Sequence, residues 1–281
     1  MDGAHASYVH FDLKPMGPVI GAELLGIDLS QDLPNEAIEE VRRALLEHKV
    51  VFFRDQDLTE DQHIAFARRF GDLEIHPATP EDQPNREILR IAHGPESRGQ
   101  ENFWHSDVTW RAEPSLGSVL RAIEIPETGG DTLFSCMYSA YDALAPELKR
   151  WVEGLTARHD IARVFAGRMD VDPEVLRQKF PIQEHPVVRT HPETGRRGLY
   201  VNVAFTTEIV GLDKPDSDWL LERLYREANI PERQCRFRWR PNSIAFWDNR
   251  ACQHYAASDY FPQVRVMERV TIKGDRPYFT P

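Results

Sequence analysis

The chain has 281 residues, 41% of them hydrophobic and 28% charged, and its formal net charge at pH 7 is −11. This composition is ordinary for a globular protein and predicts one domain over residues 1–281. The acidic balance argues against a nucleic-acid partner, and no apolar run reaches the roughly 20 residues that span a bilayer. We therefore expect neither nucleic acid nor a membrane among its partners.

The N-terminus and the cysteines indicate a cytoplasmic location. The first residues lack the basic and apolar segments of a signal peptide. Cys136, Cys235 and Cys252 are few and widely spaced, as expected for reduced thiols. Cys252 could also be a soft metal ligand two residues before His254, although an isolated cysteine is more often a small buried hydrophobe.

The N-terminal part combines short strands with two helices. Alternation broken by glycines predicts two strands within residues 8–29, and apolar residues at helical spacing predict a helix over 35–48. A buried strand is expected over residues 50–53. Thr59, together with Asp61, is expected to cap the next helix.

Residues 72–103 are rich in Pro, Asp, Glu, Asn and Gly, which predicts a long loop region with one strand at 88–91. Long loops beside a site are often lids or binding loops, so we expect this region to be mobile. His76 lies within it. It is a candidate substrate contact, and the alternative is a loop histidine hydrogen-bonded to the backbone.

His105 and Asp107 lie two positions apart in the segment 104–109. If this segment is extended, both side chains leave the same face of one strand and can bind one divalent ion from adjacent directions. The alternative is a turn or a surface pair without metal.

The second half of the chain predicts mostly strands. Residues 160–184 are irregular and charged and are expected to form a mobile insert. The other expected elements are a strand over 118–125, a helix over 138–155, a hairpin between 185 and 202, a helix over 216–228, and strands over 237–239, 243–247 and 264–272. The pattern favours a mainly β fold with helical cover, a β-sandwich or jelly roll.

His254 follows the buried strand at 243–247 and is the candidate third ligand. Two histidines and one carboxylate form the facial triad of non-heme iron(II) oxygenases. His185 and His191 each precede a proline and are interpreted as structural, because histidines beside turns usually bind backbone groups.

Two arginines and a threonine extend this pattern. Arg265 and Arg269 follow the distal histidine, and a guanidinium group is what a dicarboxylate co-substrate needs. Thr132 comes after the Gly129-Gly130 turn. It can offer a hydroxyl group to a carboxylate, or it can simply be a β-branched strand residue.

Several motifs along the chain resemble those of the taurine dioxygenase family of iron(II)- and 2-oxoglutarate-dependent oxygenases. They are Gly21-Ala22-Glu23, Gly26-Ile27-Asp28-Leu29, Phe70-Gly71-Asp72-Leu73, His76-Pro77, Trp104-His105-Ser106-Asp107-Val108-Thr109, Gly129-Gly130-Asp131-Thr132, His191-Pro192-Glu193-Thr194-Gly195-Arg196 and Trp247-Asp248-Asn249-Arg250. The resemblance runs nearly end to end.

This resemblance implies a double-stranded β-helix (jelly roll) core and a homo-oligomer, either a dimer or a tetramer. It implies that iron(II) is bound by the catalytic residues His105, Asp107 and His254, and that 2-oxoglutarate is bound by Thr132 and Arg265, with O2 as the second co-substrate. The substrate contacts that it implies are His76, Val108, Phe165, Phe205 and Arg269.

The chain departs from the taurine-specific pattern at Glu101-Asn102-Phe103 and at Thr79. Both departures fall in the expected substrate pocket and favour a more apolar or bulkier anion. The expected reaction is hydroxylation of an organosulfonate or alkyl sulfate, with release of sulfite or sulfate. The alternatives are an oxygenase acting on a carboxylate such as an aryloxyalkanoate, a zinc hydrolase and a non-catalytic ligand-binding barrel. A zinc hydrolase has no use for a dicarboxylate-binding arginine.

Overall fold

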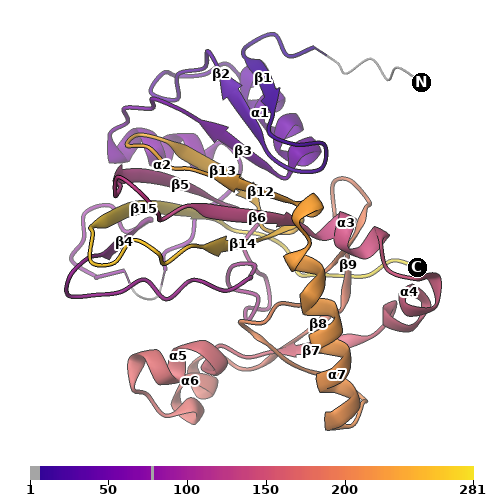
Figure 1. The fold of residues 1–281 in the computed structure, drawn as a ribbon. Coiled ribbons are helices and arrows are strands. Elements are labelled where there is room, and N and C mark those ends of the chain that lie inside the picture. The colour runs from indigo at the N-terminus through magenta and orange to yellow at the C-terminus, as the bar shows by residue number, and fades with distance from the viewer. Residues whose placement is uncertain (1–6, 77–78) are drawn as a thin grey trace.

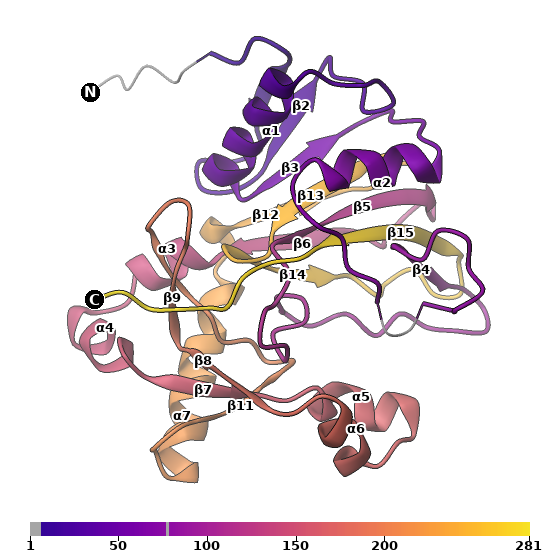
Figure 2. The same ribbon diagram turned by 180° about the vertical axis from the view of Figure 1, so that it is seen from behind.

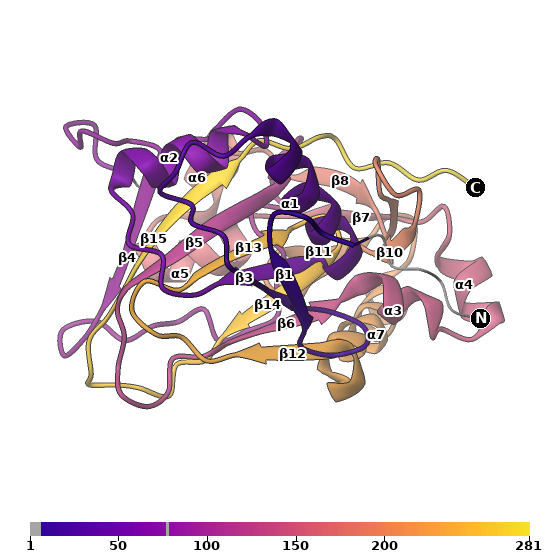
Figure 3. The ribbon, with the colours of Figure 1, turned by 90° about the horizontal axis from the view of Figure 1, so that it is seen from above.

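Two facing sheets form the centre of the protein in a computed structural model that describes residues 7–76 and 79–281 (Figure 1). The major sheet has seven strands in the order β1 (Asp12–Pro15), β2 (Ala22–Leu25), β3 (Val50–Phe53), β13 (Ile244–Asp248), β5 (Gly117–Glu124), β15 (Arg265–Ile272) and β4 (Ile88–His93). The minor sheet has the order β12 (Gln234–Phe237), β6 (Thr132–Cys136) and β14 (Cys252–Ala256). Figure 3 shows the twist across the major sheet.

The major sheet is buried on both faces because its central strands are apolar at odd and even positions. Val119, Phe246 and Val270 belong to the core shared with α1 (Asn35–His48) and α2 (Glu60–Arg68), which cover the outer face (Figure 2). Their neighbours Leu120 and Trp247 pack toward the minor sheet. Because alternate residues of each strand point to opposite faces, the major sheet contributes side chains to one hydrophobic core on each side. The predicted jelly roll with helical cover is confirmed.

The predicted helix over residues 35–48 is confirmed at both ends, and it stops where Lys49 adopts a left-handed φ of 65°. Thr59 caps the N-terminus of α2 as predicted, but its partner in the cap is not the predicted Asp61. The Thr59 hydroxyl accepts from the Gln62 N–H at 3.2 Å, and the Gln62 side chain accepts from the Thr59 N–H at 2.8 Å. Gln62, and not Asp61, completes this capping box because it occupies the third helical position.

Several predicted elements after β6 have different boundaries. The helix expected over 138–155 is two helices, α3 (Met137–Asp142) and α4 (Pro146–Val152), because Pro146 has no N–H to continue the first and suits the start of the second. The predicted hairpin is confirmed for β9 (Val188–Thr190) and β10 (Arg197–Leu199). The remaining elements are β7 (Thr156–His159), β8 (Gln183–Pro186), β11 (Thr206–Ile209), α7 (Lys214–Tyr225) and the short helices η1 (Arg226–Asn229) and η2 (Pro231–Arg233).

The prediction of an irregular segment over 160–184 is wrong. The segment contains α5 (Ala162–Met169) and α6 (Pro173–Lys179), which lie below the two sheets in Figure 1. Charged residues obscured the short apolar stripes that pack these helices against Trp110 and Phe205. The helices depend on this tertiary contact, because isolated helices of this length are marginal in water. The mobility expected for 72–103 and 160–184 stays a prediction.

The segment 72–103 also contributes to the sheet. Its predicted strand is β4, which pairs with β15 at the edge of the major sheet. Across the described residues, each helix is too short or too polar to cross a lipid bilayer.

Candidate metal centre and adjoining pockets

Three buried side chains from distant parts of the chain converge at one end of the sandwich. Nitrogen and oxygen atoms of His105, Asp107 and His254 lie within 4.8 Å of one another. His254 belongs to β14, and His105 extends the minor sheet by a single residue pair. The His105 N–H donates to the His254 carbonyl at 3.0 Å, and the reverse bond is 2.8 Å. This pairing fixes the spacing of the two imidazoles.

The segment that follows His105 is a turn, so the expected extended strand over 104–109 is wrong. Residues 107–110 form the turn, and Val108 has a left-handed φ of 48°. The cause is long-range, because the Asn249 side chain binds both backbone polar groups of Asp107, which then cannot pair with a strand. Asp107 reaches the histidines through this turn and not through alternation along a strand.

The orientation of the two imidazoles suits a shared ion. The Nδ1 atom of His105 lies 3.0 Å from the Phe103 carbonyl, so Nδ1 carries the proton and Nε2 presents its lone pair. Nε2 of His105 lies 3.7 Å from Oδ1 of Asp107, and Nε2 of His254 lies 3.9 Å from the same oxygen. These distances are too long for hydrogen bonds but suit three ligands around one ion.

The electrostatics of the cluster favour the protonation states that metal binding requires. Burial, followed by the neighbouring His105, lowers the pKa of His254 to about 3, and burial also lowers the pKa of His105. Burial alone would raise the pKa of Asp107, but the charge of Arg269 and then the imidazoles lower it to about 2. At neutral pH the site therefore holds two neutral imidazoles and one carboxylate, which fits a divalent cation.

An inner pocket beside the three ligands contains the predicted Arg265 and Thr132. Arg265 is 5% exposed, and its Nε donates to the Gly130 carbonyl at 3.1 Å. Its buried Nη2 has no partner among the described residues. The Trp239 indole donates to the Thr132 hydroxyl at 2.9 Å, so the hydroxyl proton can be given to another acceptor. The pocket is lined by Ile91, Glu101, His105, Leu120, Thr132, Trp247, His254, Ala256, Arg265, Met267 and Arg269.

The unpaired guanidinium nitrogen makes this pocket suitable for an anion. A buried charge is costly unless it is paired and hydrogen-bonded, and a carboxylate matches the planar donors of arginine. The close approach also needs Gly130, at φ 69°, since a Cβ there would lie 3.0 Å from Cδ of Arg265. The inner pocket therefore fits a ligand that carries a carboxylate toward Arg265 and reaches the metal ligands.

A second, outer pocket shares Ile91, Glu101, His105 and Arg269 with the inner pocket. It brings together all five predicted substrate contacts, His76, Val108, Phe165, Phe205 and Arg269, and it is further lined by Leu89, Ile91, Glu101, Phe103, His105, Asp107, Trp110, Val164 and Arg168. Most of these side chains are apolar. Thr79 is buried but is not among them, and Pro77 lies outside the described residues.

Arg269 connects the outer pocket to the candidate metal ligands. Its Nη1 donates to Oδ1 of Asp107 at 3.1 Å, while its buried Nε has no partner among the described residues. Burial, and then the charge of Arg269, lowers the pKa of His76 to about 4, so this imidazole is neutral at pH 7. A neutral imidazole beside a guanidinium group can bind an anion without adding a second titrating charge.

The sequence analysis missed the polar contact that holds α5 against the outer pocket. Arg168 on α5 lies 3.2 Å from one carboxylate oxygen of Glu101, and His93 lies 3.4 Å from the other. The Arg168 guanidinium also lies over the Phe103 ring, 5.3 Å from its centroid. No sequence motif indicated Arg168, because it lies in the segment that was expected to be irregular.

The remaining singled-out histidines and Cys252 have contacts elsewhere in the protein. His185 Nε2 lies 2.9 Å from the Arg111 carbonyl, and His191 Nε2 lies 2.9 Å from a carboxylate oxygen of Asp248. Cys252 is buried, with its Sγ 3.2 Å from the Asp248 carbonyl. Within the described part of the chain, the single cluster suited to a metal is the one formed by His105, Asp107 and His254.

A buried triad of two histidines and one carboxylate at the end of a jelly roll defines the class of mononuclear oxygenases with a facial triad. The family model described as "Taurine catabolism dioxygenase TauD, TfdA family" matches residues 12–271. The chain belongs to this family, whose members include α-ketoglutarate (2-oxoglutarate)-dependent dioxygenases.

Three similar proteins have names that are consistent with this family. An alkylsulfatase from Acinetobacter baylyi is 38% identical over 273 residues, covering 94% of this chain and 85% of the relative. An α-ketoglutarate-dependent sulfate ester dioxygenase from Pseudomonas putida is 36% identical over 278 residues, covering 96% and 91%. The crystal structure of a taurine dioxygenase from Burkholderia xenovorans superposes with a TM-score of 0.84 at 38% identity, covering 96% of this chain and 91% of that one.

Proposed function

We propose that this dioxygenase uses iron(II), 2-oxoglutarate and O2 to hydroxylate a small anion with an apolar tail, most suitably an alkyl sulfate ester or an alkyl sulfonate. The observation that carries the substrate class is the outer pocket, in which mostly apolar and aromatic side chains lie around Arg269 beside the triad, while the second arginine, Arg168, is paired with Glu101. Sulfate esters are also the substrates in the names of the two relatives described above.

His105, Asp107 and His254 would hold the iron on one side and leave the opposite positions for co-substrate, substrate and O2. With these bound, the iron supplies the oxidising power that inserts one oxygen atom into a C–H bond. A carboxylate in the third ligand position occupies the place that a halide would need, which favours hydroxylation as the outcome. Fe(II) is preferred to other ions because two imidazoles and one carboxylate form the set typical of non-heme oxygenases.

Arg265 would bind the far carboxylate of 2-oxoglutarate through the Nη2 atom that has no protein partner. The Thr132 hydroxyl would donate one further hydrogen bond. These contacts orient the keto acid end toward the triad, while Leu120 and Met267 exclude water from its side. The unpaired buried guanidinium is the feature that a zinc hydrolase or a passive binding barrel would not need.

Arg269 and the neutral His76 would bind the sulfate group, and Val108, Phe165 and Phe205 would contact the tail. Phe165 and Phe205 lie with their ring planes 9° apart and their centroids separated by 6.4 Å, forming one wall. Hydroxylation of the carbon that carries the ester oxygen gives a product whose C–O bond to sulfate breaks, yielding an aldehyde and free sulfate. A sulfonate would release sulfite in the same way.

The test begins with iron and co-substrate alone. Anaerobic addition of iron(II) and 2-oxoglutarate should give the weak visible absorption of their joint complex, and zinc should not. Succinate formation is then measured with alkyl sulfates, alkyl sulfonates, taurine and aryloxyalkanoates of matched length. We expect the highest kcat/KM for an alkyl sulfate, with equimolar sulfate release. A higher value for the aryloxyalkanoates would assign the carboxylate alternative, and no visible absorption would refute the cofactor assignment.

A cytoplasmic location and a dimeric or tetrameric assembly are part of the proposal. The cytoplasmic location is supported by the three cysteines, Cys136, Cys235 and Cys252, which are all buried free thiols. The dimeric or tetrameric assembly is supported by the family resemblance alone. Light scattering on the purified protein and fractionation of cells that express it would test the two.

A further inference from the structure

The Trp-Asp-Asn-Arg stretch at the end of β13 contains a side chain that binds the backbone of a metal-ligand candidate. Asn249 is 1% exposed, and its Oδ1 accepts from the Asp107 N–H at 2.7 Å. Its Nδ2 donates to the Asp107 carbonyl at 2.9 Å and to the carbonyl and hydroxyl oxygens of Ser115 at 3.3 and 3.1 Å. One amide therefore satisfies both backbone polar groups of Asp107, although the two residues are separated by 142 positions.

The turn that carries Asp107 needs such an external contact. Asp107 belongs to no strand, and the next residue, Val108, has a φ of 48°. A β-branched side chain in the left-handed region is strained and persists only where the surroundings determine it. His254, by contrast, lies on a paired strand and His105 on a bridge. Asp107 is thus the ligand whose position depends most on a side-chain contact.

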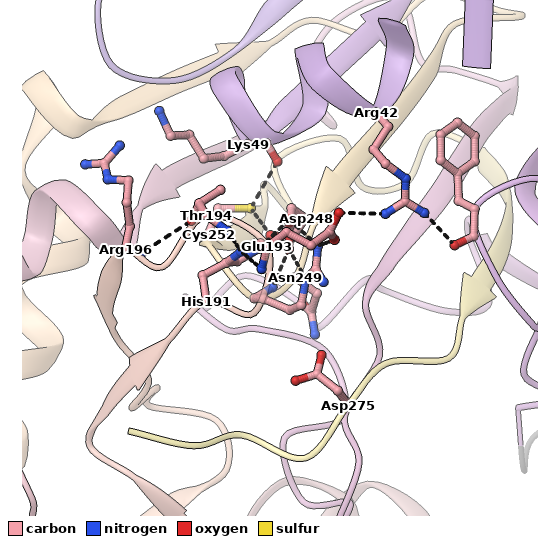
Figure 4. Close-up of polar contacts among 12 residues, drawn as sticks. Arg42, Lys49, His191, Glu193, Thr194, Arg196, Asp248, Asn249, Cys252 and Asp275 are labelled. Carbon is pink, nitrogen blue, oxygen red and sulfur yellow. Dashed lines mark hydrogen bonds and ion pairs between the residues drawn. The ribbon is translucent and has the colours of Figure 1, made fainter. Parts of the chain in front are cut away.

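The residues on either side of Asn249 belong to a network of hydrogen bonds and ion pairs around the turn after β13 (Figure 4). Asp248 accepts from Arg250 Nε at 2.9 Å and from His191 Nε2 at 2.9 Å. Arg250 also donates from Nη2 to a carboxylate oxygen of Glu193 at 2.8 Å. The other carboxylate oxygen of Glu193 accepts from Arg42 of α1 at 2.8 Å. Asp248 and Arg250 are buried, whereas the outer pair of Glu193 and Arg42 has side chains that are each 29% exposed.

We propose that Asn249 is a positioning residue, which sets the Asp107 carboxylate for metal binding by fixing the backbone of its turn. The ion pairs beyond it hold the end of β13 and act on stability alone. This inference rests on the proposed metal role of Asp107. Loss of an outer contact of this kind typically lowers metal affinity 10–100-fold.

The experiment measures Mn(II) affinity and thermal stability on the same samples. Free Mn(II) is followed by electron paramagnetic resonance without oxygen, and Tm is recorded without metal. Asn249→Ala removes both contacts with Asp107. Asn249→Asp keeps the acceptor for the Asp107 N–H and replaces the donor facing the carbonyl with a second acceptor. Arg42→Met is the matched control, because it breaks the outer ion pair and touches none of the site.

We expect Asn249→Ala to weaken Mn(II) binding 10–100-fold and Asn249→Asp to weaken it at least tenfold, while Arg42→Met stays within twofold of wild type. If Asn249→Ala does not fold, Asn249→Asp decides. Wild-type affinity in the Asn249 variants that fold would overturn the proposal. The proposal would also be overturned if Arg42→Met and an Asn249 variant lost the same Mn(II) affinity for the same decrease in Tm. A general loss of stability would then explain the weaker binding in both variants. A wild-type protein that binds no Mn(II) would instead overturn the metal centre itself.

Discussion

The inner and outer pockets share Ile91, Glu101, His105 and Arg269, but the rest of each pocket is built from a different part of the fold. The polar side chains that line the inner pocket alone come from strands, with Thr132 on β6, His254 on β14 and Arg265 on β15. Apart from Leu89 on β4, the residues that line the outer pocket alone come from loops, turns and α5, which carries Phe165.

This difference indicates that the inner pocket tolerates less sequence change than the outer pocket. Strands are held by backbone hydrogen bonds to their neighbours, so the proposed co-substrate contacts Thr132 and Arg265 lie on well-supported elements, whereas Asp107 of the candidate metal centre lies on a turn. Loops and short helices tolerate sequence change without loss of the core, so the substrate pocket can diverge while the inner pocket remains. Of the four predictions that follow, those for Asp107, Arg265 and Arg168 test this division, and the one for His63 tests a position outside both pockets.

The largest effect is expected from Asp107→Ala, which removes the only anionic ligand of the triad. Succinate formation with any substrate should fall below one thousandth of wild type, because a metal ligand is lost rather than weakened. The jelly roll itself should persist, with a Tm near that of wild type. Full turnover in this variant would refute the triad.

The second prediction concerns the inner pocket alone. Arg265→Gln should raise the KM for 2-oxoglutarate roughly a hundredfold, since breaking a buried ion pair typically costs about 3 kcal/mol or more. The KM for the anionic substrate should change far less. Arg236→Gln is the control, because its side chain is 55% exposed and lines neither pocket. Equal KM values for 2-oxoglutarate in the two variants would rule out the role of Arg265.

The third prediction concerns the helix-covered face of the major sheet, behind both pockets. His63 is completely buried, with Nε2 3.0 Å from the Val119 carbonyl, and burial lowers its pKa to about 4. The unfolded imidazole takes up a proton near pH 6.5, whereas the folded one does not, so stability is present above pH 6.5 and is lost toward pH 4.

His63→Gln should therefore lose about 2 kcal/mol less stability than wild type between pH 7.5 and pH 5. Urea unfolding at the two pH values measures this difference. Activity at pH 7.5 should stay within twofold of wild type, as the residue contacts neither pocket. An equal loss of stability in both proteins would show that His63 does not contribute to acid sensitivity.

The smallest effect is expected at the contact that holds α5. Arg168→Met keeps most of the side-chain length but removes the pair with Glu101, whose two side chains are 23% and 37% exposed. Partly exposed pairs contribute about 0.2–1 kcal/mol, so the KM for the substrate should rise by about two- to fivefold. The KM for 2-oxoglutarate should change less, because Arg168 does not line the inner pocket, although its partner Glu101 does. A larger change for 2-oxoglutarate than for the substrate would contradict the division between the pockets.

The sequence by itself determined which residues are candidates for the site and where the strands of the major sheet lie. His105, Asp107, His254 and Arg265 were found from residue type and order along the chain, although the extended strand expected over 104–109 is a turn. The helix at 35–48 and the seven strands of the major sheet followed from local periodicity. In the minor sheet, no strand was predicted for β6 or β14, and β12 was expected at 237–239.

Only the tertiary structure decided how Asp107 is presented and what closes the outer pocket. The turn at 107–110 exists because Asn249 binds the Asp107 backbone from 142 positions away, and no local pattern encodes that contact. The helices α5 and α6 form because they bury short apolar stripes against Trp110 and Phe205. In both places a long-range contact outweighs weak local preferences, which is why sequence periodicity failed where packing and side-chain hydrogen bonds set the backbone.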